Sequence, residues 1–472
     1  MSDEMLNEAA IRKWKPVLDH ADMPSITDSH RRATTARLLE NQERACREQM
    51  LSEADLPTNI IGGGGSPNIG TQGNIKGYDP ILIQLVRRAM PNLMAYDVCG
   101  VQAMSAPTGL IFAMRSKYVS QGSTYEAFFD EPITQYSGGA TAGLSAAGGV
   151  TLMGTAAGGN VVGGTDPFAG TVLDGTGLVT GAGLATATAE NLVPNEMAFA
   201  IERVAVQAKT RALAASYSTE LAQDLKAVHG LDAETELSNI LSTEIMAELN
   251  REVIKTVYNS AVLGAQQSDL YYKSVASTLN SAGATSGGVY DLVQDSDGRW
   301  SAEKFRGLMF QIERECNVIA KATRRGKGNF IIVSADVASA LAMGGFLNLS
   351  PVLTTSAINV DDTGSTFVGT LNGKIKVYVD PYGASGVNFV CVGYKGSSAY
   401  DAGLFYCPYV PLQMMRAVTT DTFQPKIAFK TRYGMVANPF SKGAGAIGAE
   451  LTPRTNQYYR LFRVDNLHGV AS

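Results

Sequence analysis

The sequence has few of the residues that build redox, metal or nucleophilic centres. It contains only 5 cysteines and 4 histidines. The cysteines are odd in number, widely spaced and without a Cys-x-x-Cys pair, so neither a disulfide framework nor a zinc site is indicated. No His-Glu-x-x-His pairing is present either. We expect no metal, no cofactor and reduced, buried thiols at Cys46, Cys99, Cys316, Cys391 and Cys407.

Long apolar runs and a strong charge imbalance are also missing. No stretch of 18 apolar residues occurs, so we expect no membrane-spanning helix. The opening residues MSDEMLNEAA lack the basic and apolar regions of a signal peptide. A net charge of -5 argues against a dedicated nucleic-acid binder. The length allows two or three domains with substantial cores.

Catalytic motifs are not found. None of Ser218, Ser242 and Ser260 lies in a Gly-x-Ser-x-Gly elbow. The glycine doublets between residues 148 and 164 are not followed by Gly-Lys-Ser/Thr, so nucleotide binding is not indicated.

Two charged clusters require an interpretation. The carboxylates of Glu244, Glu248 and Glu252 share one side of a predicted helix, where they could imitate a metal or acid-base site. Arg251 and Lys255 follow them at i+3 spacing and favour a solvated or intersubunit ionic stripe. The basic run 324–327 fits contact with nucleic acid, but a helix end or a subunit contact explains it equally well.

Three Leu-x-Glu strings gather at the N-terminus. They are Leu6 to Glu8, Leu38 to Glu40 and Leu51 to Glu53, and no other Glu has Leu or Ile two residues before it. Such a partition is expected of an N-terminal segment that a protease removes from a resistant body. Three matches in a charged segment can also arise by chance, and the pattern alone leaves both interpretations open.

Residues 1–53 are polar and helix-prone, and they indicate one or two amphipathic helices that need a partner surface. The glycine run 62–65 breaks regular structure after them. A capped helix is predicted from Asp79 to Pro91. Alternation over Leu110 to Tyr118, and a second strand around Ile201 to Ala208, predict a long hairpin. The segment 138–189 contains no Lys, Arg or Glu and favours β turns or an exposed insertion.

The second half of the sequence predicts an α+β body. A helix capped by Asp232 is expected to run to Leu263 with Gly264 after it, about 45 Å long, with an apolar row that winds around it. A second helix is expected from Ser301 to Arg325, closed by Gly326, and a short one from Ala335 to Met343. Strands are expected at 329–333, 374–379, 389–393, 427–433 and 458–464.

Several blocks of the sequence resemble the major capsid protein of T-even-type tailed phages. One is GKGNFIIVSADV from Gly326 to Val337, and the others span 85–115, 217–253, 394–412 and 423–435. The similarity covers most of residues 77–464 and is weak over 1–70 and 115–195. The resemblance implies the Hong Kong 97-type capsid fold: an N-arm, an extended β loop, a P-domain with a long spine helix, and an A-domain near the capsomer axis.

The resemblance also implies a division of the chain and a maturation step. The expected segments are a propeptide (1–53), the N-arm and start of the P-domain (54–107), the extended loop with its insertion at about 130–195 (108–215), the spine-helix region (216–290), the A-domain (291–424) and the last P-domain strands (425–472). In this family a prohead protease cuts after Leu/Ile-x-Glu. We therefore predict cleavage between Glu53 and Ala54, with Leu51 as the apolar anchor. Secondary sites are Leu6 with Glu8 and Leu38 with Glu40.

The implied function is that of a major capsid protein in the virion, assembled in the host cytoplasm into hexamers that enclose double-stranded DNA. Implied partners are copies of itself, a vertex paralogue, internal scaffold, prohead protease, portal, decoration proteins and packaged DNA. A vertex paralogue filling pentamers is the alternative, and a cytosolic enzyme is a remote one. Intersubunit candidates are Arg115 and Lys117 against Glu126, Asp130 and Glu131.

Overall fold

The computed structural model describes residues 3–19, 26, 28–53, 93–118, 126–127, 196–265, 288–293, 296, 300–349, 366–383, 386–398, 401–419, 424–441 and 451–467. The chain divides into two compact units. The larger comprises 1–109, 205–441 and 449–472, and the smaller comprises 110–204 and 442–448. The helix predicted at 79–91, the glycine run and the segment 138–189 lie outside the described residues.

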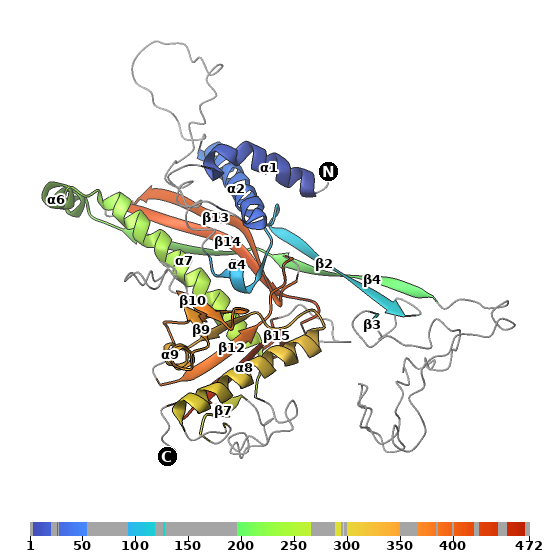
Figure 1. The fold of residues 1–472 in the computed structure, drawn as a ribbon. Helices are drawn as coiled ribbons and strands as arrows, with labels where there is room; N and C mark the ends of the chain where they lie inside the picture. The colour runs from blue at the N-terminus through green and yellow to red at the C-terminus, as the bar shows by residue number, and fades with distance from the viewer. Residues whose placement is uncertain are drawn as a thin grey trace, which may run out of the picture. The chain divides into compact units, whose positions relative to one another are not determined.

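A four-stranded sheet in the larger unit joins distant parts of the sequence (Figure 1). Its order is β1 (Gly100–Val101), β13 (Leu404–Val418), β14 (Pro425–Ala437) and β5 (Lys209–Ser216). The long strand β13 and the strand β5 are additions to the predicted elements, and β14 extends the strand predicted at 427–433. Register shifts in the β13–β14 pairing flank Val410, so the strand bulges where Pro408 and Pro411 remove ladder donors.

The second sheet of the larger unit is mixed and has eight strands. The described strands run β6 (Ala261–Leu263), β15 (Asn456–Asp465), β12 (Asn388–Gly393), β8 (Phe330–Val333), β11 (Ile375–Val379), β10 (Thr366–Leu371) and β9 (Leu347–Leu349), and β7 (Val289–Asp291) also pairs with β15. All four residues of β8 are buried, as the apolar run predicted. Strand β12 pairs with β15 and β13 pairs with β14, so both sheets cross the boundary expected at residue 424.

Two helices pack on this sheet. α8 (Ser301–Thr323) lies against β15 and β12, and α9 (Ala335–Met343) has the predicted bounds. The apolar stripe of α8 is buried as predicted, but its predicted closure by Gly326 is wrong. The left-handed residue after the helix is Arg324, with φ 52°. Gly326 is needed for another reason, because a Cβ there would come within 2.5 Å of the Tyr394 ring.

The predicted long helix is α7 (Ala233–Ser260), which begins after its N-cap Asp232. Its apolar row is buried at Leu241, Ile245, Leu249, Val253 and Val257. Its predicted end at Leu263 is wrong, because Ala261–Leu263 forms strand β6 and pairs with β15. A further capped helix, α6 (Thr219–His229), precedes it and is an addition to the predicted elements.

The smaller unit contains the predicted hairpin. Strands β2 (Thr108–Tyr118) and β4 (Met197–Gln207) are neighbours, and β3 (Glu126–Ala127) pairs with β2 on its other side. We call β2 and β4 the ribbon. In the larger unit, α4 (Ala95–Val98) precedes β1, and the N-terminal residues form α1 (Asp3–Leu18) and α2 (Ser29–Glu53). No helix among the described residues is both long and apolar enough to cross a membrane.

Candidate assembly surfaces

The N-terminal helices are packed into the core of the larger unit rather than standing free. Ala36, Leu38 and Leu39 of α2 are fully buried in the same apolar cluster as residues of α4, β1 and β13. α1 covers α2 and buries Trp14. Lys13 pairs with Glu43 between the two helices. The amphipathic segment predicted from the sequence thus has its partner surface on the body of the same chain.

Polar contacts fix α2 in register with the body. Asn41, which is buried, donates through Nδ2 to the carbonyl oxygens of Met104 at 2.7 Å and Tyr409 at 3.0 Å. Tyr409 lies within the bulge of β13, between Pro408 and Val410, and the backbone N–H of Met104 donates to the carbonyl of Pro408. A side-chain amide that satisfies two carbonyls stabilises the docked helix, and its loss would leave both without these donors.

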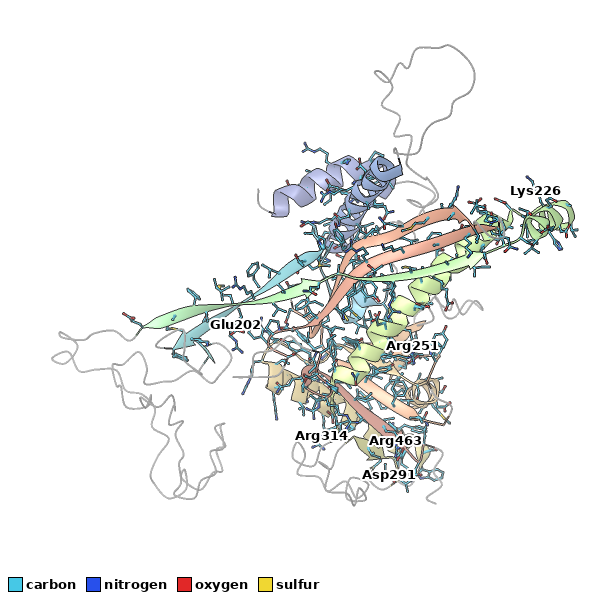
Figure 2. The ribbon with its side chains drawn as sticks, turned by 180° about the vertical axis from the view of Figure 1, so that it is seen from behind. Glu202, Lys226, Arg251, Asp291, Arg314 and Arg463 are labelled. Carbon is cyan, nitrogen blue, oxygen red and sulfur yellow. The ribbon has the colours of Figure 1, made fainter. Side chains whose placement is uncertain are left out.

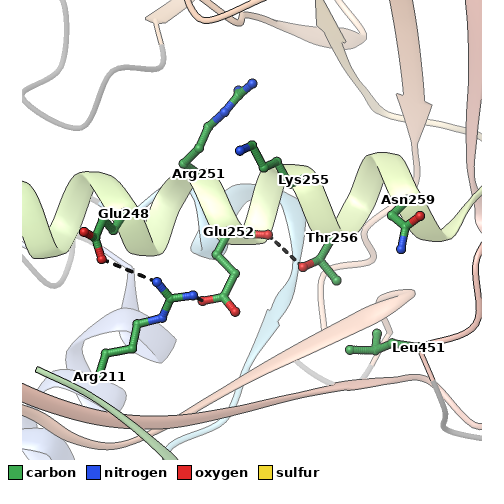
Figure 3. A pocket seen from close by; sticks show the side chains of 8 residues that line it. All are labelled: Arg211, Glu248, Arg251, Glu252, Lys255, Thr256, Asn259 and Leu451. Atoms are coloured by element: carbon green, nitrogen blue, oxygen red, sulfur yellow. Dashed lines mark hydrogen bonds and ion pairs between the residues drawn. The ribbon is translucent and has the colours of Figure 1, made fainter.

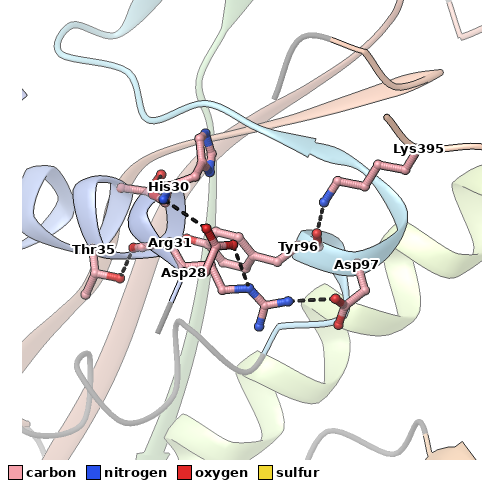
Figure 4. Close-up of polar contacts among 8 residues, drawn as sticks. Asp28, His30, Arg31, Thr35, Tyr96, Asp97 and Lys395 are labelled. Atoms are coloured by element: carbon pink, nitrogen blue, oxygen red, sulfur yellow. Dashed lines mark hydrogen bonds and ion pairs between the residues drawn. The ribbon is translucent and has the colours of Figure 1, made fainter. Parts of the chain in front are cut away.

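A second polar cluster lies at the start of α2 (Figure 4). The guanidinium of Arg31 contacts Asp97 at 2.6 Å and lies 5.4 Å from the ring centroid of Tyr96. Lys395 donates to the carbonyl oxygen of Tyr96. Burial lowers the pKa of Lys395, with Arg31 and Lys376 acting in the same direction and Asp97 opposing them. The cationic side chains of Arg31 in α2 and of Lys395 in the body therefore both interact with the carboxylate of Asp97.

The predicted cleavage residues occupy three different environments. Leu51 and Glu53 are among the last three residues of α2, and Ala54 lies outside the described residues. Leu38 is buried in the middle of α2, with Glu40 half-buried beside it. Leu6 and Glu8 belong to α1, where Glu8 is exposed.

The ribbon has two unlike faces. On one face, Arg115 contacts Glu202 at 3.3 Å, and the Arg115 side chain is only 4% exposed. Glu202 is labelled on the ribbon in Figure 2. Because side chains alternate along a strand, this contact places the even residues of β2 and the odd residues of β4 on the opposite face. That face carries six large apolar side chains, each 49–70% exposed. We call it the apolar ribbon face: Leu110, Phe112, Met114, Met197, Phe199 and Ile201.

Of the other residues predicted to contact a neighbouring subunit, Lys117 and Glu126 are described and belong to the smaller unit. Lys117 stands directly opposite Glu126 in the β2–β3 register, a position from which opposite charges attract. Asp130 and Glu131 lie outside the described residues. Sequence reasoning missed Glu202 as a partner of Arg115, because the two are 87 positions apart.

Two of the three carboxylates in the glutamate stripe of α7, those of Glu248 and Glu252, form ion pairs. Arg211 from β5 contacts Glu248 at 3.4 Å and Glu252 at 2.7 Å (Figure 3). The predicted i+3 pairing of Arg251 is wrong: Arg251 contacts Asp380 at 2.7 Å, and that carboxylate also accepts from Tyr258. An open hollow of about 610 Å³ lies beside the stripe, lined by Arg211, Glu248, Arg251, Glu252, Lys255, Thr256, Asn259 and Leu451.

Intrachain contacts also account for the basic run 324–327. Arg325 lies 5.6 Å from the Phe440 ring centroid, and Lys327 pairs with Glu313. Arg324 closes α8. Within the described part of the chain, no group of three or more His, Cys, Asp or Glu side chains is arranged to hold a metal ion.

Comparison with known proteins identifies the family of this chain. The family model described as "Major capsid protein Gp23" matches residues 75–464. The chain belongs to the Gp23 major capsid protein family. The major capsid protein of Salmonella phage ViI is 38% identical over 93% of this chain and 92% of its own. That of Enterobacteria phage T4 is 36% identical over 92% of each chain.

Membership in the Gp23 family makes this chain a structural component of a phage capsid and not an enzyme. Such a protein works as many copies in a homo-oligomeric shell. Related phages also have a vertex paralogue: the capsid vertex protein of phage T4 is 25% identical over 52% of this chain. The likeness to the major capsid proteins is higher and covers far more of the chain. In structure, the chain resembles the capsid of Myoviridae phage XM1 with a TM-score of 0.36 and 11% identity, over 79% of this chain and 92% of that one.

Proposed function

We propose that the chain is the precursor of a hexamer-forming shell subunit, that a protease cuts it after Glu53, and that residues 1–53 are then lost. The observation that carries this proposal is the family match over residues 75–464, which begins after the proposed cut. The Leu-x-Glu strings, confined to the first 53 residues, support a removable segment.

The position of Glu53 supports it as the primary site. A protease binds its substrate as an extended strand, so cleavage inside a helix requires local unfolding first. Glu53 is the last residue of α2, and little of the helix must open to free it. Cleavage after Glu40 would instead require opening the buried middle of α2, including Leu38 and Asn41.

The packing of α1 and α2 supports a role for residues 1–53 before cleavage. We propose that they hold the precursor on an internal scaffold and prevent early shell expansion. The inner side of α2 contributes to the core, so its removal takes apolar area and hydrogen bonds from the body. Loss of such contacts favours rearrangement of the remaining subunit, with α7 as the stiff spine of the P-domain.

The apolar ribbon face supports contact with a neighbouring subunit within the ring. A two-stranded ribbon is marginal alone, and six exposed apolar side chains on one face favour burial against a partner. Such a contact joins two different surfaces, and head-to-tail contacts of this kind close into rings. The proposed architecture is the Hong Kong 97-type fold, with residues 108–215 as its extended loop.

Mass spectrometry of purified particles tests the maturation proposal. The expected mature N-terminus is Ala54. A mature chain that begins at Met1, Ala9 or Asn41 would contradict cleavage after Glu53. Electron microscopy of the expressed precursor tests self-assembly: rings, tubes or shells are expected, and a persistent monomer would contradict the proposal.

A further inference from the structure

α6 is a well-formed helix that, in the part of the chain that the structure describes, contacts α7 but stays largely exposed. Its N-cap Ser218 accepts a hydrogen bond from the backbone of Leu221 at 3.3 Å, and Gly230 closes it in the left-handed region. Yet none of its 11 residues is buried. Isolated helices of this length are marginal in water, and most of their stability in proteins comes from packing an amphipathic face.

The exposed face of α6 is apolar. Leu221, Leu225 and Val228 follow i, i+4 and i+7 spacing, which confines them to an arc of about 60°. Leu221 is 51% exposed and Val228 is 74% exposed, while Leu225 is half-buried. We call these three residues the α6 stripe. This spacing is that of three successive core positions in the heptad repeat of a two- or three-helix coiled coil.

Acidic residues flank the α6 stripe on one side, and a lysine and a histidine flank it on the other. Glu220 and Asp224 lie on one flank, and Lys226 and His229 lie on the other (Figure 2 labels Lys226). When parallel helices pack around a rotation axis, the left flank of one helix meets the right flank of the next. In a parallel pair, a residue on one flank meets the residue five positions later on the facing flank of the other helix. Asp224 of one copy and His229 of the next have this spacing. Antiparallel packing would bring Asp224 against its own copy.

We propose that the α6 stripe packs against the α6 stripe of another copy, with the helices parallel around a local rotation axis. This inference rests on the proposed self-assembly and adds a second contact to it. Rings closed by the ribbon need a different contact to join one another into a shell. Three side chains bury little area, so the contact is weak alone and gains strength from repetition across the shell.

A cysteine at position 228 tests the contact and its direction. In parallel packing Val228 faces its own copy, so particles of a Val228→Cys variant should form disulfide-linked chains on mild oxidation. Gln223→Cys, on the opposite side of the same exposed helix, is the matched control and should not. Particles that form from Val228→Cys and give no more linked chains than the control overturn the proposal. Linkage through Leu225→Cys alone would indicate antiparallel helices and overturn the parallel arrangement.

A charge at the same position tests the need for the contact. Val228→Asp places a carboxylate in each contact and should lower the yield of closed particles by at least about tenfold, because an unpaired buried charge is costly. Rings should persist, since α6 contributes no buried residue to the subunit. Gln223→Asp adds the same charge on the other side and should assemble normally. Normal particle yield from Val228→Asp sinks the α6 contact alone, whereas wild-type chains that never form rings would sink the proposed function itself.

Discussion

The side-chain amide of Asn41 lies 3.0 Å from the carbonyl oxygen of Tyr409, across 368 positions of sequence. One residue belongs to the segment proposed to be discarded, and the other belongs to the bulged strand β13. Residues of α2 are therefore fixed to the body of the chain at a point where the sheet has lost regular pairing.

Removing this amide should loosen α2. Asn41→Ala leaves the carbonyls of Met104 and Tyr409 without that donor, at a cost of about 1–3 kcal/mol. We expect faster backbone hydrogen exchange over α2 in the precursor. Arg12→Ala, at an exposed position of α1, should leave exchange unchanged. Equal exchange in both variants would show that the amide contributes nothing to docking.

The acidic residue before the cut should be essential for maturation. In the proposed maturation the protease recognises the carboxylate before the cut, so Glu53→Gln should leave the full-length chain in the proheads. Glu40→Gln should mature normally, because that site lies in the packed part of α2. Denaturing gels of purified particles measure the result. Full maturation of the Glu53→Gln variant would place the cut elsewhere.

The two ribbon faces should respond differently to substitution. Phe112→Ser together with Phe199→Ser changes only exposed side chains, so the subunit should fold while assembly falls. Arg115→Ala breaks a largely buried pair with Glu202 and should cost the ribbon about 1–3 kcal/mol before any assembly step. Proteolytic sensitivity of the free subunit and particle yield separate these effects. Unimpaired assembly of the double serine variant would argue against a partner on the apolar ribbon face.

Two isoleucines of α7 provide a matched test of the spine helix. Ile245 is 2% exposed and Ile240 is 62% exposed, five residues away. Ile245→Ala should lower the free energy of unfolding by about 2–5 kcal/mol through cavity formation. Ile240→Ala should change it by less than about 0.5 kcal/mol. Similar losses in denaturant titrations would show that α7 is oriented differently.

The buried thiols should be unreactive in the folded protein. Burial raises the pKa of Cys99, Cys316, Cys391 and Cys407 from 9 to about 12. At pH 9 about one in a thousand such thiols is ionised, compared with about half of the unperturbed thiols. Iodoacetamide at pH 9 should label these four residues only after denaturation, as mass spectrometry can follow. Rapid labelling of the native protein would contradict their burial.

Elements with strong local signals were predictable from sequence. α9 has the expected bounds, and its Val337, Ala338, Ala340 and Leu341 are buried. The stripes of α7 and α8 are buried as their spacing indicates. Errors arose where a distant partner decides the structure. Ala261–Leu263 forms strand β6 instead of continuing the helix, because its backbone pairs with β15. No residue near Ala261 in the sequence indicates a strand there.

The surfaces were less predictable than the elements. Pro408 and Pro411 made β13 hard to predict, because proline lacks the N–H that a strand donates to its neighbour. The bulges that accommodate these prolines are seen only in the pairing of β13 with β14. The cleavage strings were visible as a pattern, but the distinction between Glu53 and Glu40 depends on which part of α2 is packed. The partner of Arg115 comes from another strand, and charge alone favoured nearer acids.

Strand β15 has a consequence for synthesis on the ribosome. It lies between β6 and β12 in the eight-stranded sheet, although it is translated after the other described strands of that sheet. Ala261 of β6 and Asn456, the first residue of β15, are 195 positions apart, so at about 5–20 residues per second roughly 10–40 s pass between them. β12 ends at Gly393, 63 positions before Asn456, so for roughly the last 3–13 s of that interval it has no neighbour on its β15 side. We therefore expect the nascent subunit to be most prone to aggregation just before β15 emerges.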